Sequence, residues 1–446
     1  MNKHKFYQFV IPSVCASMVT GLYFVVDGIF VGRGVGSNGL GAINLAVPFI
    51  CILTAVAMMI AMGGSTITSI FIGQGNEQKA LRSFMNSIYL VLIFSAFMTV
   101  FSFLFSDQIA RLLGARGDLL SLTSDYLRYY ILFGIFFCMA MVLAAFVRND
   151  GNPKLGLAGM AAGALSNVFL DWLFIFVFHM GIHGAAVASG LGQVISCMIM
   201  LPHFIHGKGR LKLKLLPIEQ YYTSEILRRG IPELITQMSQ PVTIFCYNLI
   251  VIRYLGNIGV SAFSVVCYLL TLVFSVFIGV SDGIQPLISR SAGEGKKELE
   301  RCFLKKGIAV NFLLAFLLYA VLLLFGEPVI HIFNREPALV KLAGESLSVY
   351  GVSFLFAAVN MIFTTYHLAS KRTFKALTIA SLRSFIINVA FIFLMPAVFG
   401  RQALWTGIIA AECTVTFIAV LMMKKHLILI PAVQRPQKTE FQRNLY

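Results

Sequence analysis

Apolar runs of about 20 residues or more recur from one end of this chain to the other. A helix of that length crosses the hydrocarbon core of a bilayer, which is about 30 Å thick, because each helical residue adds about 1.5 Å. Only 12% of the residues are charged, whereas soluble domains contain about 25%. The runs therefore predict an all-α membrane protein that crosses the bilayer many times.

Twelve transmembrane helices are predicted, arranged as two six-helix bundles. Their approximate ranges are 7–32, 42–72, 84–105, 121–148, 155–178 and 182–206, and then 225–252, 260–289, 303–325, 342–370, 376–399 and 402–426. The predicted units are an N-terminal bundle at 1–206, a cytoplasmic linker at 207–223, a C-terminal bundle at 224–430 and a cytoplasmic tail at 431–446. The linker is basic and contains a proline.

The net charge of +16 reflects membrane topology. Of the 35 Lys and Arg residues, 26 fall in the segments that share one side with the N-terminus and 7 in the segments on the other side. Such a bias marks the cytoplasmic side, so both termini are expected in the cytoplasm and the protein in a plasma (inner) membrane. Basic residues scattered over short loops do not form a nucleic-acid surface, and no nucleic-acid partner is expected.

The two halves of the chain are internal repeats. An ungapped shift of 220 residues superposes many identical residues, and one more residue of shift continues the match. Because each half has an even number of spans, the copies share one orientation and are related by a pseudo-two-fold axis along the membrane normal. Matched pairs include Pro12 with Pro232, Arg33 with Arg253, Gly73 with Gly293, Tyr130 with Tyr350 and Asn167 with Asn388.

Two acids within the predicted spans break this symmetry. Asp27 falls on Tyr247, and Asp171 falls on Ile392. A charged residue at the centre of a membrane helix costs about 2.5–3.5 kcal/mol on insertion scales, so it needs a partner or a function. Ion-coupling chemistry is therefore predicted in the N-terminal bundle.

Five polar residues from four spans are expected at one depth in the membrane. Asn167 and Asp171 lie four residues apart, hence on one helix face. Both are expected in the outer half of the membrane, together with Asp27, Tyr126 and Ser189. Two neighbouring carboxylates can share a proton. The same oxygens also suit a hard cation, and Na⁺ at Asp27, Asn167, Asp171 and Ser189 is the alternative. Asn167, Ser189 and Tyr126 also fit a role as hydrogen-bonding contacts between helices.

The chain resembles the multidrug and toxic compound extrusion (MATE) transporters. The resemblance covers nearly the whole chain and rests on Pro12, on Asp27-Gly28-Ile29-Phe30-Val31-Gly32, on the Gly36–Ala42 turn, on Gly73-Gln74-Gly75 with its copy Gly293-Glu294-Gly295, and on Asn167 with Asp171. It implies a twelve-helix antiporter that exports organic cations and other amphiphiles in exchange for H⁺ or Na⁺. It also implies that Asp27, Tyr126, Asn167, Asp171 and Ser189 form the ion site, and that Pro12 bends the first helix. Some members carry a coupling acid within span seven, whereas Glu233 is predicted at the very start of that span.

Three further ionisable residues lie within the second half. Asp282 is in span eight, where glycines and Pro286 interrupt the helix, and Arg383 is positioned to neutralise either Asp282 or Glu412. Interrupted helices often line a cavity. We therefore expect Asp282, Arg383 and Glu412 either to line a substrate cavity or to form a buried ion pair.

The predicted function is secondary active export of small molecules, carried out by a monomer in the bilayer. No enzymatic activity and no cofactor beyond the coupling ion is expected, because no nucleophile and base occur at catalytic spacing. The alternative is a flippase for a lipid-linked precursor, which requires a cationic cavity. Only Arg128 and Arg383 are predicted within spans.

Overall fold

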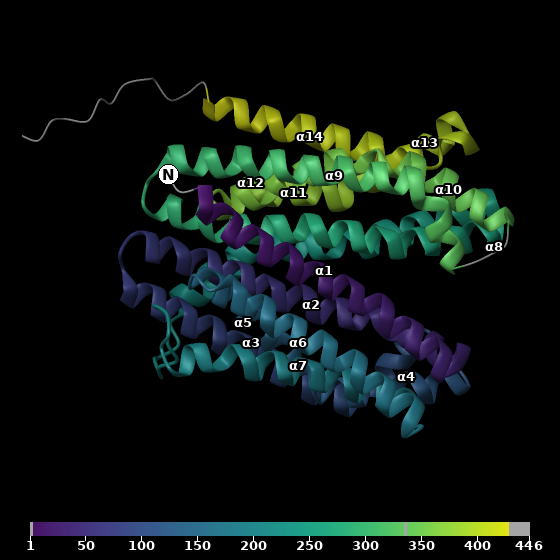
Figure 1. Cartoon of the computed structure of the whole chain (residues 1–446), viewed down its shortest axis with the longest axis horizontal. Coiled ribbons are helices and arrows are strands. Elements are labelled where there is room, and N and C mark those ends of the chain that lie inside the picture. The colour runs from purple at the N-terminus through teal and green to yellow at the C-terminus, as the bar shows by residue number, and fades with distance from the viewer. Residues whose placement is uncertain (1–2, 334–336, 428–446) are drawn as a thin grey trace, which may run out of the picture.

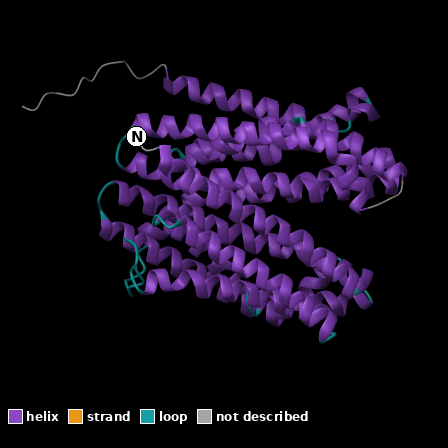
Figure 2. Ribbon diagram, in the orientation of Figure 1, coloured by secondary structure: helices purple, strands orange, loops and turns teal. Residues whose placement is uncertain are grey.

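A computed structural model describes residues 3–333 and 337–427. Within these ranges the regular structure is helical throughout (Figure 2). The predicted tail at 431–446 lies outside the described residues. The helices, drawn in Figure 1, are α1 (Lys3–Gly34), α2 (Gly36–Gly73), α3 (Glu77–Leu112), α4 (Asp118–Ile131), α5 (Gly134–Asn149), α6 (Pro153–Asp171) with the π-helical η1 (Trp172–Val177), α7 (Gly181–Ile205), α8 (Gln220–Gly293), α9 (Lys297–Phe333), α10 (Pro337–Gly351), α11 (Ser353–Ala369), α12 (Thr373–Ser381) with the π-helical η2 (Leu382–Ile386), α13 (Ile387–Phe399), the short η3 (Arg401–Ala403) and α14 (Thr406–Leu427).

The described residues contain ten unbroken spans and two bent ones, which confirms the predicted twelve-helix fold. The α8 segment supplies two of the ten, Gln220–Gly256 and Ile258–Gly293. They meet at Gly256, whose positive φ of 65° ends the first helix, a conformation that glycine adopts without a steric penalty. The bent spans join α4 to α5 at 52° and α10 to α11 at 45°.

Side-chain hydroxyls explain both bends. The Thr99 hydroxyl donates to the Ile131 carbonyl at 3.2 Å, and that of Tyr319 donates to the Ser348 carbonyl at 2.8 Å. Each carbonyl belongs to the last turn before a bend, where it would otherwise accept only from the amide four residues later. A bend costs little when another group satisfies the freed backbone. The sequence predicts both spans as single helices, without these bends.

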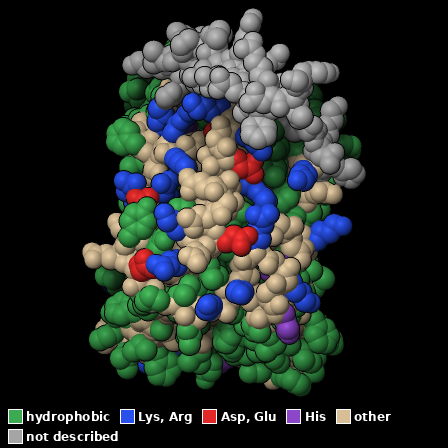
Figure 3. Space-filling model, turned by 90° about the vertical axis from the view of Figure 1, so that its left-hand side faces the viewer, with side chains coloured by type: hydrophobic (Ala, Val, Ile, Leu, Met, Phe, Trp, Pro, Cys, Tyr) green, Lys and Arg blue, Asp and Glu red, His purple; other side chains and the backbone are tan. Residues whose placement is uncertain are grey.

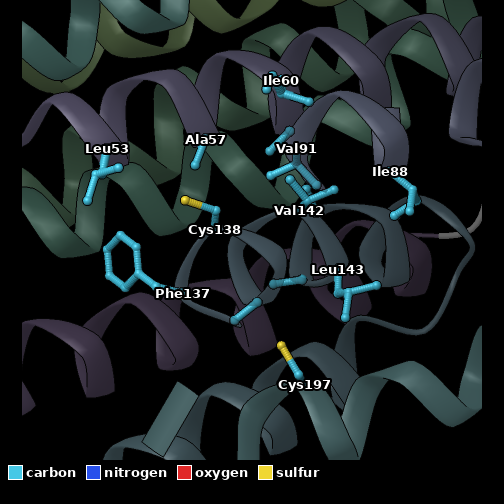
Figure 4. Packing of buried hydrophobic residues seen from close by; sticks show 14 of the residues in the cluster. Leu53, Ala57, Ile60, Ile88, Val91, Phe137, Cys138, Val142, Leu143 and Cys197 are labelled. Carbon is cyan, nitrogen blue, oxygen red and sulfur yellow. The ribbon is translucent and has the colours of Figure 1, made fainter. Parts of the chain in front are cut away.

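Most helices of the two halves form separate groups, purple to teal below and green to yellow above in Figure 1. The exception is α1, which begins in the upper group, where Phe6 and Val10 pack with Val280 and Ile284, and crosses to the lower group. Buried apolar residues of α2, α3, α5 and α7 form the core of the first half, and Figure 4 shows part of it around Leu53, Ile60 and Val142. The second half has its own core around Tyr247, Phe263 and Trp405. The residue limits of the bundles given above stay a prediction.

Glycines bring the halves into backbone contact at one end. A Cβ on Gly73 would collide with the Arg290 carbonyl, and one on Gly293 would collide with the Ile70 carbonyl, so α2 and α8 touch without side chains between them. Arg290 is related to Ile70 by the 220-residue shift, and the contact is therefore two-fold symmetric. Toward the opposite end the two halves diverge (Figure 1).

The same end carries the basic loops. Lys and Arg side chains gather on it in Figure 3, with hydrophobic side chains on the flanks. The first turn of α1 and the last turn of α14 also lie at this end (Figure 1). We refer to it as the basic end, which the charge bias predicts to face the cytoplasm.

The segment between α7 and α8 is bonded to the first half. The Asp150 carboxylate accepts from the amides of Arg210 at 2.8 Å and Leu211 at 3.2 Å, and it contacts His203 at 2.8 Å. Nearer α8, Glu219 forms an ion pair with Arg82 of α3 at 2.7 Å. The linker is therefore fixed to α3, α5 and α7 along its length.

Candidate functional site

The carboxyls of Asp27 and Asp171 contact each other inside the first half. Asp27 is on α1, one turn before Val31, which is fully buried. Asp171 is the last residue of α6 and is itself fully buried. The two side chains are within hydrogen-bonding distance. Because neither ionised carboxylate has a proton to donate, this contact requires a shared proton or a bridging cation.

Asn167 and Ser189 complete the surroundings of Asp171. In the amide orientation that satisfies both neighbours, Asn167 donates to Asp171 Oδ2 at 3.1 Å and accepts from the Ser189 hydroxyl at 3.3 Å. It also accepts from the Ser189 amide at 3.0 Å. The helix becomes π-helical directly after Asp171, a geometry that is frequent at functional sites. The sequence-predicted pair on span five and the hydroxyl on span six are therefore brought together.

Two tyrosines lie against the acids, and one of them was missed by sequence reasoning. Tyr126, predicted from span four, is 4% exposed and close enough to Asp27 and Asp171 to interact with both electrostatically. Tyr23 was not predicted, although it precedes Asp27 by one helical turn and so shares its face. The Tyr23 side chain forms a hydrogen bond with Ser189. The spacing of four residues between Tyr23 and Asp27 was the available signal.

This cluster, which we call the acid cluster, consists of Tyr23, Asp27, Tyr126, Asn167, Asp171 and Ser189. One oxygen of each acid, Asp27 Oδ1 and Asp171 Oδ1, is buried without a hydrogen-bond partner among the described residues. Buried oxygens of this kind are costly unless they bind something. Carboxylate, amide and hydroxyl oxygens are ligands for a hard monovalent cation, and the acids can equally hold a proton.

Pro12 lies within α1 and is buried. Its missing amide leaves the carbonyl one turn earlier without its helical partner. The residues on either side are held by α8, since a Cβ on Gly279 would collide with Val14 and one on Gly283 with Val10. Any bend here would move Tyr23 and Asp27 relative to α8.

A second polar region lies in the C-terminal half, where a cavity is enclosed by α8, α11, α13 and α14 and by η2. Glu233 lines it, and the sequence placement of this residue was wrong. The helix starts at Gln220 rather than near 225, so Glu233 lies more than three turns inside it. Its carboxylate accepts from Gln237 at 2.8 Å. Other polar residues that line the cavity include Thr236, Gln237, Gln240, Thr243, Asp282, Arg383, Asn388 and Glu412.

The three ionisable residues predicted here all line the cavity, and Arg383 pairs with only one of the two acids. Arg383 Nε contacts Glu412 Oε1 at 2.8 Å, and both side chains are buried. The amide of Asn360 donates to Glu412 Oε2 at 2.7 Å. Asp282 instead forms an ion pair with Arg148 of α5 at 2.9 Å, which joins the two halves. The structure thus selects Glu412 as the partner of Arg383.

No group of three or more His, Cys, Asp or Glu side chains with metal-binding geometry occurs among the described residues. The predicted Na⁺ ligands Asp27, Asn167, Asp171 and Ser189 include only two acids. Any cation there would also need the amide and hydroxyl oxygens.

A family model, MatE, matches this chain twice, over residues 12–173 and 232–394. The chain belongs to the MatE family. The starts of the two matches differ by 220 residues and their ends by 221, which are the shifts found between the internal repeats. MatE membership and the twelve spans together make the protein an integral membrane transporter.

Curated relatives of this MatE protein include multidrug export proteins named MepA. The one from Staphylococcus aureus strain MRSA252 is 25% identical over 418 residues, covering 93% of this chain and 92% of its own. The one from Staphylococcus haemolyticus is 26% identical over 419 residues with the same coverage.

Solved structures share the fold. One, described as the outward-facing conformation of a multidrug resistance MATE family transporter of the MOP superfamily, has a TM-score of 0.90 and 22% identity and covers 95% of each chain. A MOP superfamily transporter from Pyrococcus furiosus, described as having a binding pocket of reversed polarity, has a TM-score of 0.88 and 23% identity, also over 95% of each chain.

Proposed function

We propose that this protein is a secondary active antiporter that exports small organic cations and amphiphiles in exchange for H⁺ or Na⁺. The observation that carries the proposal is the contact between Asp27 and Asp171 inside a transmembrane bundle. Family membership and the MepA relatives, which are named as multidrug export proteins, support export of small molecules.

The acid cluster supplies the coupling step. Neither Asp27 nor Asp171 has Lys or Arg among its close electrostatic neighbours in the described chain, so an exchangeable cation is the natural counter-charge. Binding can drive a conformational change only by its different affinity for two states. A bend at Pro12 would separate or join Asp27 and Asp171, because they lie on different helices. The shared proton or Na⁺ would then favour the conformation in which the two acids meet.

The cavity in the C-terminal half supplies a binding region for cations. It contains three acids and one arginine, and that arginine is already paired with Glu412. Arg148 pairs with Asp282 and is also close enough to Glu233 to interact with it electrostatically, whereas the hydrogen bond to Glu233 comes from Gln237. The three acids outnumber the two arginines, and an acidic cavity with apolar and hydroxyl side chains is suited to a small organic cation.

The same cavity argues against the flippase alternative. A pyrophosphate-linked lipid would require several uncompensated basic groups. Among the described residues that line the cavity, Arg383 is the only base, and Glu412 neutralises it. Arg128 pairs with Asp107 on the first half instead.

Several finer features belong to the same proposal. The protein would act as a monomer in a plasma membrane, with both termini in the cytoplasm and without a cofactor other than the coupling ion. It would have no catalytic activity.

The test is export of a fluorescent organic cation from proteoliposomes under separate pH and Na⁺ gradients. Wild-type protein should transport the dye under one of the gradients, and Asp27→Asn should lose this transport while inserting normally. Tyr247→Phe is the matched control, because Tyr247 occupies the repeat position equivalent to Asp27, and it should retain transport. Dye export by Asp27→Asn at the wild-type rate would refute the coupling role, and no export under either gradient would refute the antiporter.

A further inference from the structure

A groove on the first half is separate from both polar regions. It has a volume of about 470 Å³ and is bounded by α3, α5 and α7 and by the linker that follows α7. Small-molecule sites usually have volumes of about 300–1,000 Å³. Figure 4 shows Ile88 of α3, Leu143 of α5 and Cys197 of α7, which contribute to its wall.

Along its length the groove has almost no polar group that is free to bond a ligand. Its wall is almost entirely hydrocarbon, and the two polar side chains in it besides Lys214 each already make a hydrogen bond. The Tyr89 hydroxyl accepts from the Leu216 amide at 3.2 Å, and the Cys197 thiol donates to the Phe136 carbonyl at 3.3 Å. This wall is suited to a hydrocarbon chain, because a polar ligand would be left without hydrogen bonds.

The groove lies within the leaflet at the basic end. On α3 it is lined from Met85 to Leu92, a distance of about 10 Å along the helix, and Leu92 lies about 22 Å from the start of α3 at Glu77. Half of the hydrocarbon core is about 15 Å thick, and the headgroup layer adds several more. A groove about 10 Å long therefore holds the first part of an acyl chain from the leaflet at the basic end.

A positive charge marks the end of the groove nearest the linker. Lys214 lines it and is exposed. The nearest acid along the linker, Glu219, is already paired with Arg82, and the preceding linker residues Lys208, Arg210 and Lys212 are also basic. Lys214 is the base that lines the groove, and its charge attracts an anionic headgroup and repels the organic cations proposed as substrates.

We propose that this groove is a binding site for one anionic phospholipid from the leaflet at the basic end. One acyl chain would lie between α3, α5 and α7, with the phosphate at Lys214. The inference does not depend on the proposed transport reaction. Because the linker forms one wall of the groove, the bound lipid would pack the linker more firmly against the N-terminal half.

The test measures lipid binding to the purified full-length protein by native mass spectrometry, with phosphatidylglycerol and phosphatidylcholine as probes. We expect one phosphatidylglycerol to bind more tightly than any phosphatidylcholine. Lys214→Glu should weaken that binding about tenfold, since about one favourable interaction is lost and one repulsion is added. Lys212→Glu is the matched control, because it makes the same charge change two residues away, outside the groove. It should weaken binding about twofold at most.

A second pair of variants tests the groove without changing charge. Leu92→Trp fills the deep end, whereas Ile93→Trp places the same side chain on the adjacent, 59% exposed position outside the wall. Only Leu92→Trp should reduce lipid binding. The proposal is overturned if Lys212→Glu and Lys214→Glu weaken binding equally, if the two Trp variants behave alike, if phosphatidylcholine binds as tightly, or if a transported organic cation displaces the lipid.

Discussion

The two halves of this transporter retain related polar positions in their cores and differ in charge. In the first half, Asp27 and Asp171 meet without a base among their close neighbours. In the second half, Glu412 is held by Arg383 at 2.8 Å. A cluster that contains its own counter-charge has little need of a diffusible one, whereas two acids alone must take up a cation or a proton. The difference supports the proposal that ion exchange belongs to the first half and the substrate cavity to the second.

The repeat explains how this difference is built. Asn388, the counterpart of Asn167, donates to the hydroxyl of Thr243 at 2.6 Å, and Thr243 falls on Tyr23 in the 220-residue shift. Placing Gly184 opposite Gly407 aligns the last span of the first half with the last span of the second. That alignment places Glu412 on Ser189. The amide position of Asn167 and the hydroxyl position of Tyr23 are retained, while the acids occupy different positions in the two copies.

Breaking the acid cluster should have the largest effect. Asp171→Asn should reduce gradient-driven export about 100-fold or more, because an ion with equal affinity for both conformations shifts nothing. The fold should remain as stable as wild type, since the variant removes a buried acid and keeps the hydrogen bond to Asn167. Transport rates in proteoliposomes and thermal unfolding of the same preparation measure both effects. Export within threefold of wild type would contradict the assignment.

Breaking the ion pair in the second half should affect stability first. Arg383→Met leaves Glu412 buried without its counter-charge and should destabilise the protein by about 3–5 kcal/mol. The double variant Arg383→Met/Glu412→Gln should recover most of this loss, because Gln still accepts from Asn360 and no charge remains. Thermal unfolding in detergent separates the two variants. If the double variant is folded but does not transport, the ion pair has a role in coupling, contrary to the difference proposed between the two halves.

A smaller effect is expected at Tyr23. Tyr23→Phe removes one hydrogen bond to Ser189, which is worth about 1 kcal/mol, or about a fivefold loss in the apparent affinity for the coupling ion. Its repeat counterpart, Thr243→Val, should lower the unfolding temperature and leave that affinity unchanged. Export rates at a series of ion concentrations distinguish the two. Equal effects on affinity would show that the hydroxyls serve the same purpose in both halves.

The smallest effect is expected from Ser189→Thr. The substitution keeps the oxygen that contacts Asn167 and Tyr23, so the ion affinity should change by about twofold at most. Ser189→Ala, which removes that oxygen, is the comparison. If the two variants lose affinity equally, the hydroxyl takes no part in the site.

The sequence predicted the membrane class, the span number and most of the acid cluster. Span length and apolar composition determine the first two, and the spacing of Asn167 and Asp171 on one helix face determines much of the third. The repeat supplied the comparison between Asp27 and Tyr247. These features are local or periodic, and a sequence displays them directly.

Other features required coordinates. The bend between α4 and α5 depends on Thr99 reaching the Ile131 carbonyl from another helix, which no local pattern encodes. The choice of Glu412 over Asp282 by Arg383 depends on how α14 packs beside η2, and Asp282 pairs across the halves with Arg148. Glu233 was misplaced because polar residues before it, Gln220 to Arg229, conceal the true start of the helix.

The contact between Gly73 and Gly293 has an evolutionary consequence. Each glycine faces the backbone of the other copy, so the contact places the same steric restriction on both halves of a duplicated gene. Neither half can acquire a side chain there without the same collision, however far their interiors diverge. Duplication thus left one shared surface that must stay alike, beside two cores that were free to specialise.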